Sequence, residues 1–237
     1  MSKEKDPQDF LAPSYYFDHE HPRVRAFIEE SVGDAVDAVE RAVKLYYAVR
    51  DGIRYDPYRF YMRKEYFTAS RTLIEGAAYC VPKANLLTAV ARGAGIPARV
   101  GFADVRNHLS TEKLRRSMGS DLFIWHGYTE VWLDGRWLKA TPAFNLSLCE
   151  KFGLLPLEWD GTADSIYHPY DRAGQRHMEY VRQRGSFDEL PLAQIVADFA
   201  AYYPPELSRS PASEASDFGD DAARERARAG AQEGTPT

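Results

Sequence analysis

The sequence of 237 residues contains few of the features that mark exported, membrane-spanning or nucleic-acid-binding proteins. It has only two cysteines, Cys80 and Cys149, which are too few for a disulfide framework. The polar start "MSKEKDPQDF" lacks the apolar core of a signal peptide, and no apolar run approaches the length of a membrane span. The net charge of −5 is not the basic footprint of a nucleic-acid-binding protein. We therefore expect a cytoplasmic protein whose partners are neither nucleic acids nor membranes.

What the sequence does have is the composition of an ordinary globular protein, with 44% hydrophobic and 27% charged residues. That is enough chain to bury a core. We divide it into an irregular arm over residues 1–21, one folded domain over residues 22–203 and a tail over residues 204–237. Small and charged residues dominate the tail, so we expect it to be disordered or loosely helical.

Apolar residues at helical spacing predict the helices. They indicate two helices, or one broken helix, over residues 23–49 and a short helix over residues 68–76. A further helix is expected from about residue 81 to 94, with Pro82 in its first turn, where a missing N–H does no harm. The last expected helix runs from about residue 191 to 203.

Strands are predicted after the helix at residues 81–94. The segment "ARVGFADV" is typical of a strand, and "FIWHGYTEVWLDGRWLKATPAF" is the clearest hairpin in the chain. Its two apolar runs are joined by Asp134-Gly135, a dipeptide that favours tight hairpin turns. Within the first run, His126, Tyr128 and Glu130 share one face of the strand.

Cys80 and His126 are candidates for nucleophilic catalysis, which requires a thiolate, a base and a group that orients the base. Cys80 precedes a predicted helix, and the positive end of a helix dipole stabilises a thiolate. His126 lies on a predicted strand. Each residue alone is better explained by packing, since buried free cysteines are common in protein cores.

The surroundings of the two residues resemble the transglutaminase-like superfamily of papain-fold cysteine enzymes. In "YCVPKANLLTAVARGAGIPARVGF", a cysteine opens a helix that leads into Arg-x-x-Gly-Ile-Pro-Ala-Arg, here residues 92–99, and then a strand. In "HGYTEVWLDGRWLKATP", a histidine begins a strand, a glutamate follows four residues later and a turn leads to a tryptophan, here His126, Glu130 and Trp137. With the upstream segment "LYYAVRDGIRYDPY", the resemblance covers about residues 22–145.

The resemblance implies an α+β fold of the papain-like or transglutaminase-like type. An antiparallel sheet would pack against helices, and Cys80, at the N-terminus of the central helix, would face His126 on the sheet. It also implies acyl transfer through an acyl-enzyme on an amide, peptide, ester or thioester, without a cofactor or a metal. Small members with this layout resemble bacterial amidase-like or protease-like proteins. Water or an amine could be the acyl acceptor, and the alternative is a binding module that has lost catalysis.

The sequence departs from the family's pattern at the residue that orients the histidine. The family usually has an aspartate after the hairpin, and Thr141 occupies that slot here. A threonine hydroxyl can fix the imidazole tautomer but carries no charge to stabilise imidazolium. Asn145 is the second candidate, in the manner of a Cys-His-Asn triad, and Asp160 or Asp164 could supply a carboxylate from elsewhere.

A second departure lies upstream of the nucleophile, where the family often has Gly-x-Cys and this chain has Ala78-Tyr79-Cys80. The bulkier entry points to a particular substrate pocket. The backbone N–H of Cys80 is the natural first oxyanion donor. Tyr79 and Tyr128 are candidates for the second donor by position.

Asn107 and His108 follow the strand after the cysteine helix. They are expected near the active-site end of the sheet, where they could contact substrate, although loop residues of this kind often bond only to backbone. The later segment that contains His168 and His177 lacks the spacing of a metal site, so we expect no metal.

Overall fold

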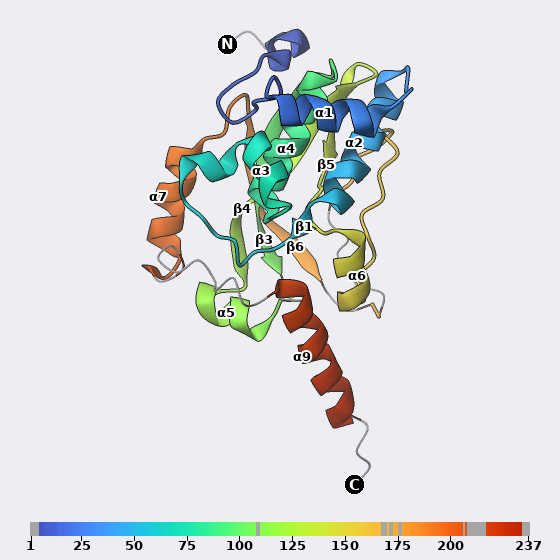
Figure 1. Cartoon of the computed structure of the whole chain (residues 1–237). Helices are drawn as coiled ribbons and strands as arrows, with labels where there is room; N and C mark the ends of the chain where they lie inside the picture. The colour runs from blue at the N-terminus through green and yellow to red at the C-terminus, as the bar shows by residue number, and fades with distance from the viewer. Residues whose placement is uncertain are drawn as a thin grey trace.

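The computed structural model describes residues 5–107, 110–166, 170, 173–174, 177–205, 207 and 217–233. Figure 1 shows helices packed beside a curved sheet. The helices are η1 (Pro7–Leu11), α1 (Pro22–Val32), α2 (Ala38–Gly52), η2 (Lys64–Phe67), α3 (Ala69–Glu75), α4 (Cys80–Gly93), α5 (Glu112–Met118), α6 (Leu146–Phe152), α7 (Leu192–Tyr202) and α9 (Phe218–Glu233). The strands are β1 (Arg54–Tyr55), β2 (Ala77–Ala78), β3 (Ala98–Asn107), β4 (Leu122–Leu133), β5 (Arg136–Ala140) and β6 (Met178–Phe187).

The main sheet has four antiparallel strands in the order β5-β4-β3-β6. The predicted hairpin is confirmed as β4 and β5, which pair from Thr129 with Ala140 to Leu133 with Arg136. At its turn, Asp134 and Gly135 have φ values of 49° and 80°, the left-handed region that this turn type needs. Strand β6 closes the other side of β3, in a segment where the sequence predicted only short pieces. The predicted α+β class with an antiparallel sheet is confirmed.

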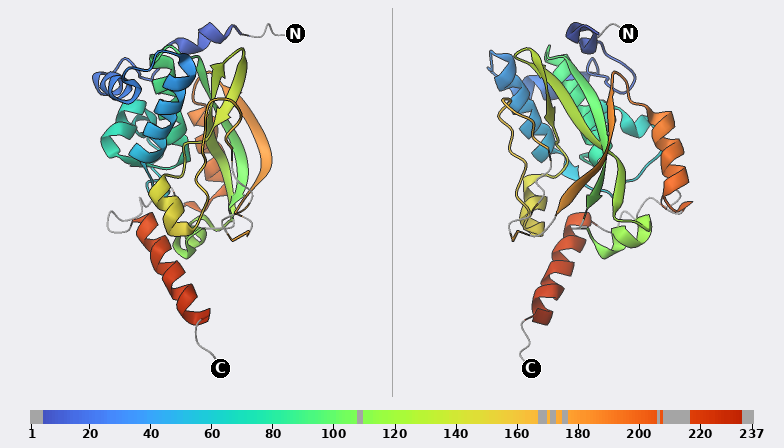
Figure 2. Two further views of the ribbon diagram at one scale, coloured as in Figure 1. Left: turned by 90° about the vertical axis from the view of Figure 1, so that its right-hand side faces the viewer. Right: turned by 180° about the vertical axis from the view of Figure 1, so that it is seen from behind.

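Helix α4 is the central element of the fold. Its side chains are buried from Cys80 to Arg92, and Figure 2 shows the helical layer lying against one face of the sheet. Two hydroxyl contacts bind α4 to the sheet: Thr129 donates to the Ala84 carbonyl at 2.9 Å, and the Thr88 and Thr129 hydroxyls lie 3.2 Å apart. The helix therefore cannot slide along β4 without breaking buried hydrogen bonds.

The first turn of α4 is also fixed to the end of α2. Lys83 is completely buried, and its ammonium donates to the carbonyl of Arg50 at 2.8 Å and to the carbonyl of Ile53. Carbonyls at a helix C-terminus lack intrahelical partners, so a lysine satisfies them. Burial lowers the pKa of Lys83 to about 7. The turn that begins with Cys80 is thus held between the sheet and α2.

The chain before α1 packs onto the body. Phe17 is fully buried, and the Arg92 guanidinium lies 4.4 Å from its ring centroid. Arg92 also donates to the Ala12 carbonyl at 2.9 Å. The N-terminal arm is therefore anchored through Phe17.

The described part of the C-terminal tail includes a helix, α9, where the composition predicted a disordered or loosely helical segment. Its first residue, Phe218, is buried against three rings, with centroid distances of 5.9 Å to Tyr55 and 5.5 Å to both Tyr58 and Phe152. The Asp217 carboxylate accepts from the Asp220 N–H at 3.0 Å and caps the helix. One aromatic anchor and one cap thus hold the start of α9, which then extends away from the body (Figure 1).

Among the described residues, no helix has both the length and the apolar character that a membrane crossing requires.

Candidate active site

Cys80 is the first residue of α4, as the sequence predicted, and 7% of its surface is exposed. Backbone groups of Gly127, Val81 and Cys80 itself hydrogen-bond to the sulfur and favour the thiolate. Burial outweighs them and raises the pKa of the Cys80 thiol to about 12. The resting residue is therefore a neutral thiol with donors already aimed at its sulfur.

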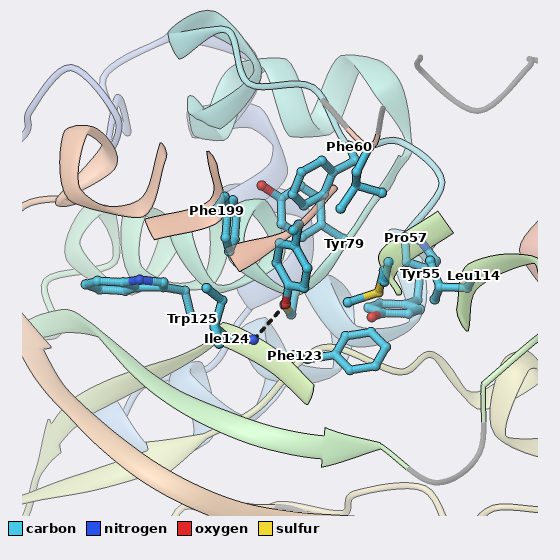
Figure 3. Close-up of a pocket in the computed structure, with 13 residues that line it drawn as sticks. Tyr55, Pro57, Phe60, Tyr79, Leu114, Phe123, Ile124, Trp125 and Phe199 are labelled. Carbon is cyan, nitrogen blue, oxygen red and sulfur yellow. Dashed lines mark hydrogen bonds between the residues drawn. The ribbon is translucent and has the colours of Figure 1, made fainter. Parts of the chain in front are cut away.

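The Cys80 side chain opens into an apolar pocket, which we call the Cys80 pocket (Figure 3). Its walls come from β1, the start of α4, α5, β4 and α7. The lining residues are Tyr55, Pro57, Phe60, Tyr79, Cys80, Leu114, Met118, Phe123, Ile124, Trp125, Phe199, Tyr203 and Leu207. None of these residues carries a charge, so the environment of the thiol is a hydrocarbon and aromatic one.

At Gly127, β4 approaches the N-terminus of α4 closely. A Cβ on Gly127 would lie 3.1 Å from the Ala84 Cβ and 3.2 Å from the Cys80 carbonyl oxygen and the Val81 Cα. Because two of these neighbours are backbone atoms, they cannot move aside as a side chain would. The absence of a side chain at Gly127 lets the sheet approach the N-terminus of α4.

Replacing Gly127 with alanine should lower kcat/KM by about tenfold or more, because an added methyl pushes β4 away from Cys80 and small misplacements of reacting groups are costly. Gly52→Ala is the matched control, since a Cβ there meets nothing within 4 Å. Steady-state kinetics and thermal unfolding of both variants test this. Equal activity of the two variants would show that the close approach is unimportant.

His126 precedes Gly127 on β4 and is 2% exposed. Burial lowers the pKa of His126 to about 3, and the nearby His177 acts in the same direction. A hydrogen bond with the backbone of Gly127 acts in the opposite direction. His126 is therefore a neutral imidazole at physiological pH. It does not line the Cys80 pocket, and it directly precedes Gly127, whose backbone hydrogen-bonds to the Cys80 sulfur.

The strand changes course immediately before His126. Trp125 has φ = 58°, and its N–H donates to the Asp104 carboxylate at 3.0 Å. The Trp125 indole donates to Asp198 at 2.7 Å, and Arg184 binds both Asp104 and Asp198. A tryptophan in the left-handed region needs such support, because its Cβ is crowded there. The buried ion pairs thus fix the backbone that presents His126.

The match to a known family covers the segments that carry Cys80 and His126. Residues 25–142 match the family model of the transglutaminase-like superfamily. The chain belongs to this superfamily over these residues. A search of curated proteins finds no significant match.

Three solved structures are similar at low identity. A cysteine protease candidate from Cytophaga hutchinsonii is 17% identical, with a TM-score of 0.46 over 78% of this chain and 55% of that chain. A protease candidate from Parabacteroides distasonis is 16% identical, with a TM-score of 0.38 over 60% and 26%. Red sea bream transglutaminase is 15% identical, with a TM-score of 0.39 over 90% and 42%. The chain thus spans about half or less of the length of these proteins.

Thr141, in the slot where the transglutaminase-like superfamily usually has aspartate, follows β5. Continuing the pairing of Thr129 with Ala140 places Thr141 opposite Tyr128, on the face of β4 that also carries His126. Its hydroxyl is buried without a hydrogen-bond partner, and its backbone is fixed by Ser165 at 3.1 Å. A buried hydroxyl is stabilised by a partner, so Thr141 has a free hydrogen-bonding group to offer on this face.

Asn145 is already occupied by structural hydrogen bonds. Its carbonyl oxygen accepts from the Tyr55 N–H at 2.9 Å, and its amide donates to the Ser147 hydroxyl at 2.7 Å. The two acidic alternatives are similarly engaged, since Asp160 accepts from Thr162 and Asp164 accepts from the Lys139 N–H. These bonds already engage the side chains of Asn145, Asp160 and Asp164, and Thr141 therefore remains the first candidate for orienting His126.

Thr141→Ala and Asn145→Ala should separate a role in orienting His126 from a role in stabilising the fold. Loss of one neutral hydrogen bond at His126 should lower kcat/KM about threefold to tenfold in Thr141→Ala. Asn145→Ala leaves the Tyr55 N–H without its acceptor and should lower the unfolding free energy by about 1–3 kcal/mol at nearly unchanged kcat/KM. Kinetics and urea unfolding measure the two effects. The reverse pattern would transfer the orienting role to Asn145.

The two tyrosines expected near the oxyanion lie in different surroundings. Tyr79 lines the Cys80 pocket beside Phe60, with ring centroids 5.4 Å apart, and its buried hydroxyl has no hydrogen-bond partner. Tyr128 packs on Gly101 of β3 and donates to Gln183 of β6 at 3.5 Å. Of the two tyrosines, only Tyr79 lines the Cys80 pocket, whereas Tyr128 lies on the face of β4 that also carries His126.

Asn107 and His108 were expected at the rim of the site. Asn107 ends β3, is 5% exposed and donates its backbone N–H to the Asp121 carbonyl at 2.9 Å. It does not line the Cys80 pocket. His108 lies outside the described residues.

Gly127, Asp104 and Tyr55 are parts of the site that the sequence did not indicate. Gly127 separates His126 from Tyr128, and the signal for it was a glycine inside a strongly apolar strand, which often marks a close backbone approach. Tyr55 lines the pocket, and its pKa is raised by burial and by the nearby Cys80. No sequence pattern linked Asp104 or Tyr55 to the site.

Proposed function

We propose that the chain catalyses cysteine-dependent acyl transfer, with Cys80 as the nucleophile, His126 as the general base and acid, and Thr141 as the residue that orients His126. The observation that carries this proposal is the close approach of β4, the strand that carries His126, to Cys80 at the start of α4: a Cβ on Gly127 would lie 3.2 Å from the Cys80 carbonyl oxygen. Its support also comes from the pocket into which Cys80 opens. The substrate is an amide, peptide, ester or thioester.

The reaction begins from a neutral pair. As the sulfur of Cys80 attacks the carbonyl carbon, its proton passes to His126, and the carbonyl oxygen becomes an oxyanion. The backbone N–H of Cys80 donates to that oxyanion. The bond to the leaving group then breaks, the leaving group takes the proton from His126, and a thioester joins the acyl group to Cys80.

The second half of the reaction releases the acyl group. Water or an amine attacks the thioester while His126 accepts its proton. The carbon–sulfur bond breaks, and the sulfur regains a proton from His126. Hydrolysis, in the manner of an amidase or protease, is the form we propose first, with amide formation on a small molecule second. The two free cysteines agree with a reducing compartment such as the cytoplasm, which we include in the proposal.

Intact-protein mass spectrometry tests the proposal. The purified chain is mixed with p-nitrophenyl butyrate or the S-phenyl thioester of butyrate and quenched in acid after short times. We expect a mass increase of one butyryl group on the peptide that contains Cys80, with a burst of the leaving group. No adduct and no turnover with either donor would favour the rival reading, a transglutaminase-like binding module without catalysis.

A further inference from the structure

A second apolar cavity, which we call the α7 groove, adjoins the Cys80 pocket along α7. Its lining residues are Phe60, Met62, Val196, Phe199, Ala200, Tyr203, Pro204, Pro205 and Leu207. Four residues line both spaces: Phe60, Phe199, Tyr203 and Leu207. The two cavities are therefore separated by shared side chains and not by a layer of backbone. Figure 3 shows Phe60 and Phe199 at the pocket, and their ring centroids are 5.1 Å apart.

We call the Cys80 pocket and the α7 groove together the passage. The passage is narrow beside Cys80 and wide along α7. The free volume is about 30 Å³ in the Cys80 pocket and about 310 Å³ in the α7 groove. The inner space has room for one or two water-sized groups. An unbranched chain fits such a constriction, whereas a substituent next to the carbonyl does not.

The chemistry of the walls is uniform. Among the residues that the structure describes, neither lining set contains an aspartate, glutamate, lysine, arginine or histidine. The Tyr203 hydroxyl is used twice, accepting from the Ile124 N–H at 2.8 Å and donating to the Leu122 carbonyl at 3.1 Å. The Trp125 indole N–H is bound to Asp198. A charged or peptide-like acyl group would lose its hydration here without finding partners, while an alkyl chain loses nothing.

We propose that the passage holds the acyl part of the substrate, and that this acyl group is an unbranched alkyl chain of medium length. This specificity rests on the proposed function, because it assigns the Cys80 pocket and the α7 groove to the acyl group bound to Cys80. The acyl chain extends from the thioester carbonyl carbon, which is bonded to the Cys80 sulfur, past Phe60 and Phe199 into the groove. A substrate with an α-amino group or a β-branched acyl residue is excluded by the same walls.

A thioester series measures the specificity. Straight-chain acyl groups from acetyl to dodecanoyl are compared with one constant thiol leaving group. Burying each further methylene should raise kcat/KM about fourfold until the groove is filled. Changing the leaving group at constant acyl chain should produce no such trend. A flat response to acyl length, in an enzyme that forms the acyl-enzyme, overturns the assignment.

Two tryptophan substitutions on the exposed side of α7 provide the matched test. Ala200 is exposed and lines the α7 groove, whereas Ala197 is exposed on the same helix and lines neither cavity. Ala200→Trp should lower kcat/KM for decanoyl thioesters by tenfold or more and leave acetyl thioesters unchanged. Ala197→Trp should leave both unchanged. An equal effect on both chain lengths, or the same effect from both variants, overturns the proposal.

Binding without chemistry separates this inference from the proposed function. In the Cys80→Ala variant, calorimetry with 2-undecanone and 2-butanone measures ligand binding to the passage in the absence of acyl transfer. Tighter binding of the longer ketone, weakened by Ala200→Trp, supports an alkyl site even if no acyl-enzyme is ever trapped. Equal binding of the two ketones overturns it even if acyl transfer occurs.

Discussion

Cys80→Ala should abolish the acyl-enzyme and lower turnover by about a thousandfold or more, because no other group in the site can form the covalent intermediate. Cys149→Ala should still form the acyl-enzyme and should retain its turnover. The two residues form a matched pair, since both are free and buried, with exposed fractions of 7% for Cys80 and 1% for Cys149. Mass spectrometry of the trapped intermediate and steady-state kinetics measure the difference.

The comparison of the two cysteines tests whether activity depends on the surroundings of Cys80 or only on the presence of a buried thiol. Cys149 lies within α6, and its sulfur is 3.9 Å from the Phe144 carbonyl, whereas Cys80 starts a helix and receives backbone hydrogen bonds at its sulfur. Thermal unfolding of both variants serves as the control for folding. If Cys149→Ala lost activity while folded, or if Cys80→Ala still formed an adduct, Cys80 would not be the nucleophile.

The parts of the site that could be predicted from the sequence were those encoded within a few residues. Pro82 after Cys80 marked the start of α4, and Asp134-Gly135 marked the turn of the β4–β5 hairpin, because both depend on local backbone conformation. The order of these segments then indicated the family. Local chemistry was sufficient for these elements, and the structure has them at the predicted positions.

The parts that could not be predicted depend on contacts between distant segments. Most residues of strand β6 are half-buried or exposed, so the strand has little of the apolar alternation that identifies a strand, and its pairing with β3 defines it. Phe218 becomes an anchor only because Tyr55 and Phe152 create a place for it. The Cys80 pocket and the α7 groove likewise combine side chains from five segments of the chain, none of which shows the site by itself.

The second large effect is expected from removing His126, the proposed general base, which is neutral in the folded chain. His126→Ala should lower kcat/KM by about a hundredfold to ten-thousandfold, the usual contribution of a general base. Because burial lowers the pKa of His126 to about 3 and raises that of Cys80 to about 12, both residues keep one protonation state from pH 5 to 9. The kcat/KM of the native chain should therefore be nearly constant over that range. His21→Ala, at an exposed cap of α1, is the control.

The pH profile separates this neutral pair from a preformed thiolate–imidazolium pair. An ion pair would give a bell-shaped profile, with one limb where the thiolate forms and another where the imidazolium loses its proton. Unfolding must be followed in parallel. The folded pKa of His126 lies below its unfolded value of about 6.5, so the unfolded chain binds more protons and stability falls as the pH drops from about 6.5 toward 3. A bell with limbs between pH 5 and 9, in chain that stays folded, would mean that Cys80 and His126 exchange their proton before substrate binds.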